Sequence, residues 1–213
     1  MKKVMTGICV AAAITMVSST VLADDSGFYV LGAVGQTRVN YDKAGADTAL
    51  TNAGVTGLVS TTSNNPTAYR LQAGYQFHPN WAIESGYVDL GKISYSATGV
   101  VGVTPGTANE TDKAEAWNVS AVGILPFGNS FSALGKLGIA SVRSAANATV
   151  TLTGVGTATL GQSKTKTNAT YGLGLKYDLT KNVSVRGDYD NYDTGVTGAG
   201  NIGVWSLGVA YKF

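Results

Sequence analysis

The sequence predicts an all-β fold: an eight-stranded antiparallel, up-and-down transmembrane β-barrel with short periplasmic turns and long extracellular loops. Three observations lead to this prediction. Apolar and polar residues alternate with a period of two in eight segments of about ten residues. The connections between these segments are alternately long and short, as in outer membrane barrels. Only 13% of the 213 residues are charged and 28 are glycine, whereas a soluble domain carries roughly 25% charged residues.

The N-terminus predicts export from the cytoplasm. Two lysines precede an apolar stretch at residues 7–17, and small residues follow at 21–23. This order is typical of a signal peptide, so we expect residues 1–23 to be cleaved and residues 24–213 to form the barrel domain. Cleavage removes Cys9 and both lysines, which leaves equal numbers of basic and acidic groups and no cysteine. A disulfide framework is therefore excluded for the mature chain.

The strands follow in chain order. The first is predicted at residues 28–37, and three hairpins follow: 68–77 with the run from Trp81, 117–125 with 131–141, and 170–179 with 183–189. Turn residues at 78–80, 126–130 and 180–182 close these hairpins. The last strand covers 204–213, and the long loops are expected at 39–67, 94–113, 145–166 and 191–200. The long loops are rich in β-prone residues, so the strand pairs are expected to extend beyond the membrane as hairpins.

The aromatic residues indicate which face of each strand meets lipid. They gather at strand ends, beside the short turns and towards the long loops, as in the two interfacial girdles of a membrane barrel. We expect the following residues in these girdles: Phe77, Trp81, Trp117, Phe127, Phe131, Tyr177 and Trp205. A soluble lipocalin-like barrel, with its apolar face inside, is the alternative fold.

Two segments resemble the transmembrane domain of the outer membrane protein A (OmpA) family. Residues 74–87 with 90–92 resemble its second hairpin, and residues 206–213 resemble its last strand. The resemblance implies an eight-stranded barrel with a filled, polar interior. It also implies that Tyr211 and Phe213 form the signal read by the outer membrane barrel assembly machinery. The OmpA family continues into a peptidoglycan-binding domain, and that anchoring function is not carried over to this chain.

Charged residues on the polar strand faces predict an ion-pair network in the lumen. The predicted members are Glu84, Lys136, Lys176, Arg186 and Asp188, with Arg70 nearer the loop end. The resemblance implies a central ion pair of Glu84 with Arg186 and a basic role for Lys136. Lys176 stands where the family has an acid, and Val122 where it has a base. We expect a locally basic lumen, in which every charge must be paired because an unpaired one costs several kcal/mol.

The predicted function is a structural and surface-interaction role in the outer membrane of a Gram-negative bacterium: membrane integrity and contacts through the loops. The alternatives are a narrow, gated, porin-like channel with anion preference and a soluble lipocalin-like binding protein. The expected partners are outer membrane lipids, lipopolysaccharide, the assembly machinery, and host surfaces or phage at the loops. The barrel is expected to be a monomer, and its small net charge argues against nucleic acid binding.

No catalytic constellation is evident in the sequence. His78 is the single histidine and lies in a predicted periplasmic turn, so neither a Ser-His-Asp site at the loop end nor a histidine metal cluster is available. Two acid pairs remain as candidates, Asp188 with Asp190 and Asp42 with Asp47. Such acids are more often solvating residues of a loop or lumen. We therefore expect no enzyme activity, metal or cofactor.

Overall fold

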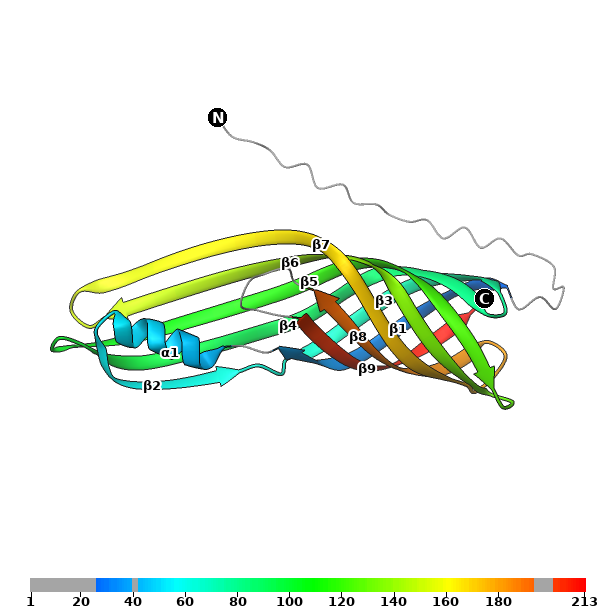
Figure 1. Ribbon diagram of the computed structural model, residues 1–213, viewed down its shortest axis with the longest axis horizontal. Coiled ribbons are helices and arrows are strands. Elements are labelled where there is room, and N and C mark those ends of the chain that lie inside the picture. Colours follow the sequence, from blue (N-terminus) through cyan, green and yellow to red (C-terminus); the bar gives the residue numbers. More distant parts are fainter. Residues whose placement is uncertain (1–25, 40–41, 194–200) are drawn as a thin grey trace, which may run out of the picture.

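The computed structural model describes residues 26–39, 42–193 and 201–213. The chain forms one antiparallel sheet that closes on itself (Figure 1). Its elements are β1 (Gly27–Val39), α1 (Lys43–Asn52), β2 (Val55–Ser63), β3 (Thr67–His78), β4 (Trp81–Val101), β5 (Thr104–Phe127), β6 (Phe131–Leu152), β7 (Gly156–Asp178), β8 (Val183–Asp193) and β9 (Asn201–Lys212). The predicted signal peptide lies outside the described residues.

Eight of the nine strands form the barrel. The ring runs β1–β3–β4–β5–β6–β7–β8–β9 and closes where β9 pairs with β1, from Tyr29 opposite Lys212 to Val39 opposite Ile202. The predicted eight-stranded antiparallel barrel is therefore confirmed. Closure pairs the first barrel strand with the last, so that their backbone N–H and C=O groups find hydrogen-bond partners. Lipid could not provide such partners.

Four strands are about twice as long as predicted. β4, β5, β6 and β7 run for 21 to 24 residues and continue well beyond the ends of the other barrel strands (Figure 1). The predicted loops 94–113 and 145–166 are thus hairpin extensions of the sheet, as their β-prone composition had indicated. Their turns use glycines with positive φ, 63° at Gly102 and 76° at Gly154. We call this projecting sheet, with β2 at its margin, the extracellular wall.

The first long connection holds two elements that the sequence patterns did not predict. β2 pairs with the outer part of β4, from Val55 opposite Val101 to Ser63 opposite Ser94. Helix α1 begins after Asp42, whose carboxylate accepts a hydrogen bond of 2.9 Å from the Gly45 amide. None of the residues in α1 is buried, so the helix has no apolar stripe by which periodicity could reveal it.

The apolar strand faces point outward. Leu137 is 71% exposed and Leu173 is 68% exposed, whereas Glu84 is 1% exposed inside the barrel. The lipocalin-like alternative is therefore wrong, because a soluble barrel would need the opposite arrangement. Trp117 and Phe127 lie ten residues apart on β5, which at about 3.3 Å per residue and a tilt of roughly 40° spans about 25 Å of membrane.

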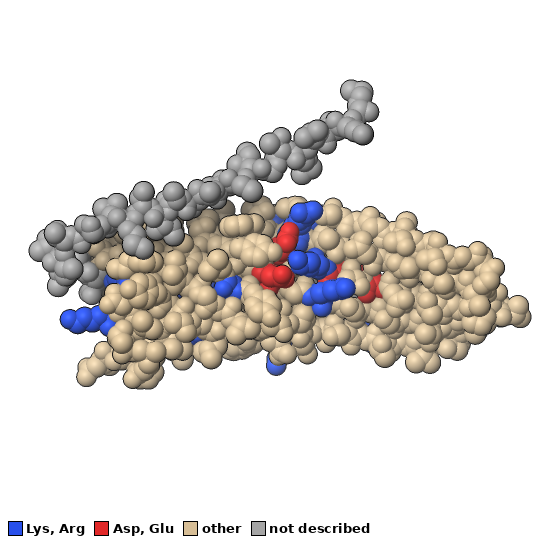
Figure 2. Space-filling model, turned by 180° about the vertical axis from the view of Figure 1, so that it is seen from behind, with Lys and Arg blue, Asp and Glu red and all other residues tan. Residues whose placement is uncertain are grey.

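On the face shown in Figure 2, acidic and basic side chains gather midway along the molecule, and most of the remaining surface carries neither. Two ion pairs lie near Trp117 on the outer surface of the sheet. The Lys113 ammonium is 3.6 Å from the Asp89 carboxylate, and the Arg143 guanidinium is 3.7 Å from the Glu115 carboxylate. Within the described residues, no helix is long and apolar enough to cross a bilayer.

Candidate functional site

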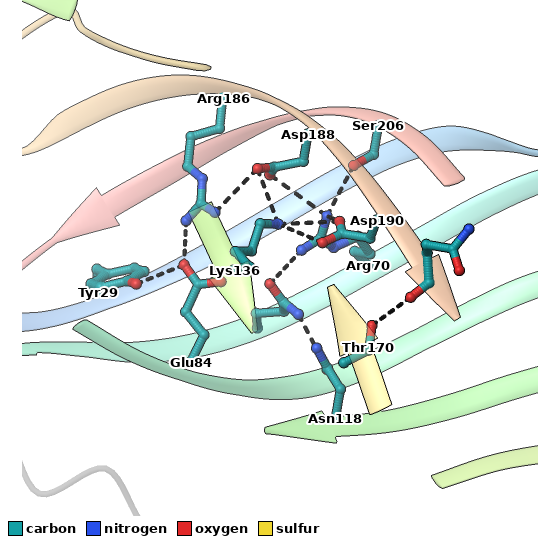
Figure 3. A network of polar contacts seen from close by, with 12 residues as sticks. Tyr29, Arg70, Glu84, Asn118, Lys136, Thr170, Arg186, Asp188, Asp190 and Ser206 are labelled. Carbon is teal, nitrogen blue, oxygen red and sulfur yellow. Dashed lines mark hydrogen bonds and ion pairs between the residues drawn. The ribbon is translucent and has the colours of Figure 1, made fainter. Parts of the chain in front are cut away.

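The barrel lumen holds a cluster of six buried charged side chains, which we call the lumen network. Arg70 comes from β3, Glu84 from β4 and Lys136 from β6. Arg186, Asp188 and Asp190 alternate along β8, and the period of two directs all three inward. Figure 3 shows how these side chains converge from strands on opposite sides of the ring.

Arg186 connects two acidic groups. Its guanidinium pairs with Glu84 and lies 3.3 Å from Asp188 Oδ1. The Tyr29 hydroxyl donates a hydrogen bond of 2.6 Å to the same Glu84 oxygen. The Glu84–Arg186 pair that the resemblance implied is therefore present in the structure. Both residues are 3% exposed or less, so each charge depends on the other for solvation.

Lys136 and Arg70 share the other two carboxylates. The Lys136 ammonium lies 3.1 Å from Asp188 and 2.8 Å from Asp190. Arg70 pairs with Asp190 and lies 3.6 Å from Asp188. It also donates hydrogen bonds to Ser206 Oγ (3.1 Å) and Gln72 Oε1 (2.7 Å). The contacts continue from Gln72 to Asn118 Oδ1 at 3.2 Å.

The lumen network is electrically neutral. It combines three basic groups, Arg70, Lys136 and Arg186, with the acids Glu84, Asp188 and Asp190. The prediction of a locally basic lumen is wrong for this buried layer. Neutrality follows physically, because an uncompensated charge would cost several kcal/mol where water is scarce.

Glycines on the neighbouring strands make room for the network. A Cβ added at Gly172 would lie 2.3 Å from Asp190 Oδ1, and one added at Gly174 would lie 2.2 Å from Asp188 Oδ1. At Gly74 a Cβ would lie 2.2 Å from the Tyr29 ring. The glycine-rich inner face therefore has a steric cause, which is the close approach of large polar side chains.

Apolar side chains flank the network on its extracellular and periplasmic sides. On the extracellular side, the core includes the fully buried side chains of Val88, Leu90, Tyr192 and Val204. On the periplasmic side a second cluster contains Val122, Ile124 and Leu134 beside the Tyr29 ring. Apolar packing therefore seals the network on the extracellular side, whereas on the periplasmic side a cavity lined by the second cluster reaches Arg186.

Lys176 does not belong to the network, contrary to the prediction. Its ammonium lies 3.1 Å from Asp178, near the periplasmic end of β7. Asp190 was missed as a member, although it lies two residues from Asp188 and therefore on the same strand face. Tyr29, Gln72 and Ser206 were also missed, because uncharged polar residues on a small-residue face give no distinct signal.

The other predicted residues fall into three places. All the predicted girdle residues are exposed on the outer face: Phe77, Trp81, Trp117, Phe127, Phe131, Tyr177 and Trp205. Tyr211 and Phe213 are also exposed, and their rings meet edge to face at 5.1 Å. His78 lies in its turn, where Nδ1 accepts a hydrogen bond of 3.2 Å from the Asn80 amide.

Neither acid pair forms a free carboxylate dyad. Asp188 and Asp190 are each bound by Lys136 and Arg70. In the extracellular region, Asp47 pairs with Lys43 at 2.7 Å and accepts a hydrogen bond of 2.5 Å from the Tyr95 hydroxyl. These contacts lower the pKa of Asp47 to about 2. The described residues contain no cluster of three or more His, Cys, Asp or Glu side chains suited to a metal ion.

Residues 9–213 match the outer membrane protein beta-barrel domain, and the chain belongs to this family. The protein is accordingly an outer membrane protein. No curated protein matches the chain.

Solved structures of three bacterial proteins are similar to this chain. Ail of Yersinia pestis, solved with the heparin analogue sucrose octasulfate, is 18% identical with a TM-score of 0.47, and the alignment covers 88% of this chain and 97% of Ail. Neisserial surface protein A is 14% identical with a TM-score of 0.45, covering 89% and 100%. OprG of Pseudomonas aeruginosa is 15% identical with a TM-score of 0.47, covering 88% and 96%.

Proposed function

We propose that this barrel is a structural and surface-interaction protein of the outer membrane, which contributes to membrane integrity and makes contacts through its extracellular wall. The observation that carries the proposal is the unpaired edge of β7 in that wall, on the side away from β6. Along residues 156–165, β7 pairs with β6 on one side, and no second strand pairs with it in the described part of the chain. Its pairing with β8 begins only at Thr170 opposite Tyr192.

An open strand edge offers backbone donors and acceptors to another chain. Such an edge binds an extended segment by strand addition, and main-chain hydrogen bonds supply much of the affinity. Residues 156–165 are exposed along their whole length, contain no proline and carry one charged side chain, Lys164, so most of the edge is open to pairing. The edge projects beyond the barrel (Figure 1), and a host protein or phage protein is the proposed partner.

The edge can be shortened without changing the register between β6 and β7, while the outer part of β6 moves by four residues along β5. Ala146 pairs with Gln162 and Thr149 with Thr159, so deletion of residues 146–149 together with 159–162 removes four residues from each strand and preserves the alternation of faces. We expect the shortened barrel to fold and show normal heat-modifiable gel mobility. Adhesion of producing cells to host cells is expected to fall severalfold.

The matched control is Val155→Ser, which changes the exposed hairpin tip but leaves the edge at full length. We expect it to retain adhesion. Unchanged adhesion of the shortened barrel, at equal surface abundance, would contradict the proposed interaction role.

The apolar layer on the extracellular side of the lumen supports a structural role over a channel. A narrow gated channel is the second candidate, favoured by a periplasmic cavity that reaches inward as far as Arg186. The apolar layer that contains Leu90 and Val204 would have to separate before ions could pass. We expect no discrete conductance steps from the pure folded protein in planar bilayers, and regular steps would establish the channel instead.

The remaining proposals concern assembly and the surrounding membrane. The exposed aromatic residues are proposed to contact outer membrane lipids and lipopolysaccharide at the two interfaces. Tyr211 and Phe213 are proposed to be read by the assembly machinery, and residues 1–23 to be removed on export. The mature barrel is proposed to be a monomer, since its ring closes within one chain.

A further inference from the structure

The periplasmic end of the barrel contains a cavity of about 520 Å³. Residues of all three short turns line it, and its inner end reaches Tyr29 and Arg186. Binding sites for small molecules usually measure roughly 300–1,000 Å³ and combine apolar walls with a few placed polar groups. The cavity therefore has a suitable size for a small ligand, and its lining shows which chemistry fits.

The lining has an apolar part and a basic part. Val122, Ile124 and Leu134 supply apolar surface from β5 and β6. The charged residues of the lining are Lys176, Lys181, Arg186 and Lys212 with a single acid, Asp178. Arg186 belongs to the neutral lumen network, and apart from it the three lysines of the lining still outnumber the single acid.

The strand register concentrates this positive charge. Lys176 lies directly opposite Arg186 in the β7–β8 pair, and both side chains line the cavity. Like charges at opposed positions are destabilising. The charge of Arg186 is compensated by the buried carboxylates of Glu84 and Asp188. The charge of Lys176 is compensated less, because its partner Asp178 is 41% exposed to solvent. Arg186 Nε is buried without a hydrogen-bond partner.

We propose that this cavity binds a small organic anion from the periplasmic side. Its carboxylate or phosphate group would lie among Lys176, Arg186 and Lys212 and accept hydrogen bonds from them. Such charge-assisted hydrogen bonds are stronger than those between neutral groups. Its apolar portion would pack against Ile124 and Leu134. This site is independent of the extracellular interaction role, because it lies at the opposite end of the barrel.

The test uses the folded full-length barrel in lipid nanodiscs. Benzoate and phenyl phosphate serve as anionic probes and benzamide as the neutral probe of similar shape, with methyl NMR signals of Ile124 and Leu134 as the readout. We expect saturable shifts with the anions and binding at least about tenfold weaker with benzamide. Whichever anion binds more tightly identifies the preferred head group.

Lys176→Met is expected to weaken anion binding about fivefold, because it removes one charged donor while keeping the length of the side chain. Lys164→Met is the matched control, since Lys164 lies in the extracellular wall. This variant is expected to bind the anionic probes with unchanged affinity. Equal binding of benzamide and benzoate, shifts that never saturate, or full affinity in Lys176→Met would overturn the proposal. Loss of adhesion in the shortened barrel leaves this result unaffected.

Discussion

The Glu84–Arg186 pair offers a direct test of whether the lumen network acts as one balanced unit. Glu84→Gln removes one negative charge but keeps an oxygen that can accept the Tyr29 hydrogen bond. Arg186→Met removes one positive charge and keeps much of the side-chain volume. Each single substitution leaves an uncompensated charge among groups that are at most a few per cent exposed.

The expected magnitudes follow from that imbalance. Breaking a buried ion pair by removing one partner costs about 3–5 kcal/mol. In the double variant, Arg70 and Lys136 still balance Asp188 and Asp190, so the loss is expected to be no greater than in either single variant. The coupling energy of the cycle is then about 3 kcal/mol or more, where independent sites would give a total loss of about 6–10 kcal/mol.

Urea-induced unfolding in lipid vesicles provides the measurement. The protein has three tryptophans, all exposed on the outer face, so their fluorescence reports departure from lipid. Lys176→Met is the control and should cost less than about 1 kcal/mol, because its ion pair with Asp178 is partly exposed. Additive losses in the double variant would refute the balanced-network argument.

Two further predictions concern sterics and pH. Gly174→Ala places a Cβ 2.2 Å from Asp188 Oδ1 and is expected to lower the free energy of unfolding by about 1–3 kcal/mol. The control is Gly135→Ala, whose Cβ enters open space and which should be nearly neutral in the same urea assay. Equal losses in the two variants would contradict the steric argument. Burial and the nearby Glu110 raise the pKa of Asp112, in the extracellular wall, to about 6. The folded wall therefore holds a proton that the unfolded chain releases near pH 4, and the free energy of unfolding should fall as pH rises from about 4 to 6 and then level off. Asp112→Asn should remove this slope from the pH dependence of unfolding, and an unchanged slope would exclude Asp112 as its cause.

Periodicity identified the barrel because its cause is local. A strand with lipid on one side and the lumen on the other must alternate apolar and polar residues. Leu137, which is exposed on the outer face, and its neighbour Lys136, which is buried in the lumen, show the two environments. The turn residues of the three short connections were equally local signals. Helix α1 gave no such signal, because its placement depends on contacts such as that between Asp47 and Tyr95, 48 residues apart.

The sequence by itself determined the number of barrel strands, the face that meets lipid, and most of the charged residues that point inward. These follow from a period of two and from the cost of charge in a bilayer. Only the tertiary structure decided which charges meet. The ring brings Arg70 of β3 to Asp190 of β8, 120 residues away, and leaves Lys176 outside the network at the periplasmic end. Ring closure and strand tilt set the height of each side chain in the lumen, and that height is not encoded in any single strand.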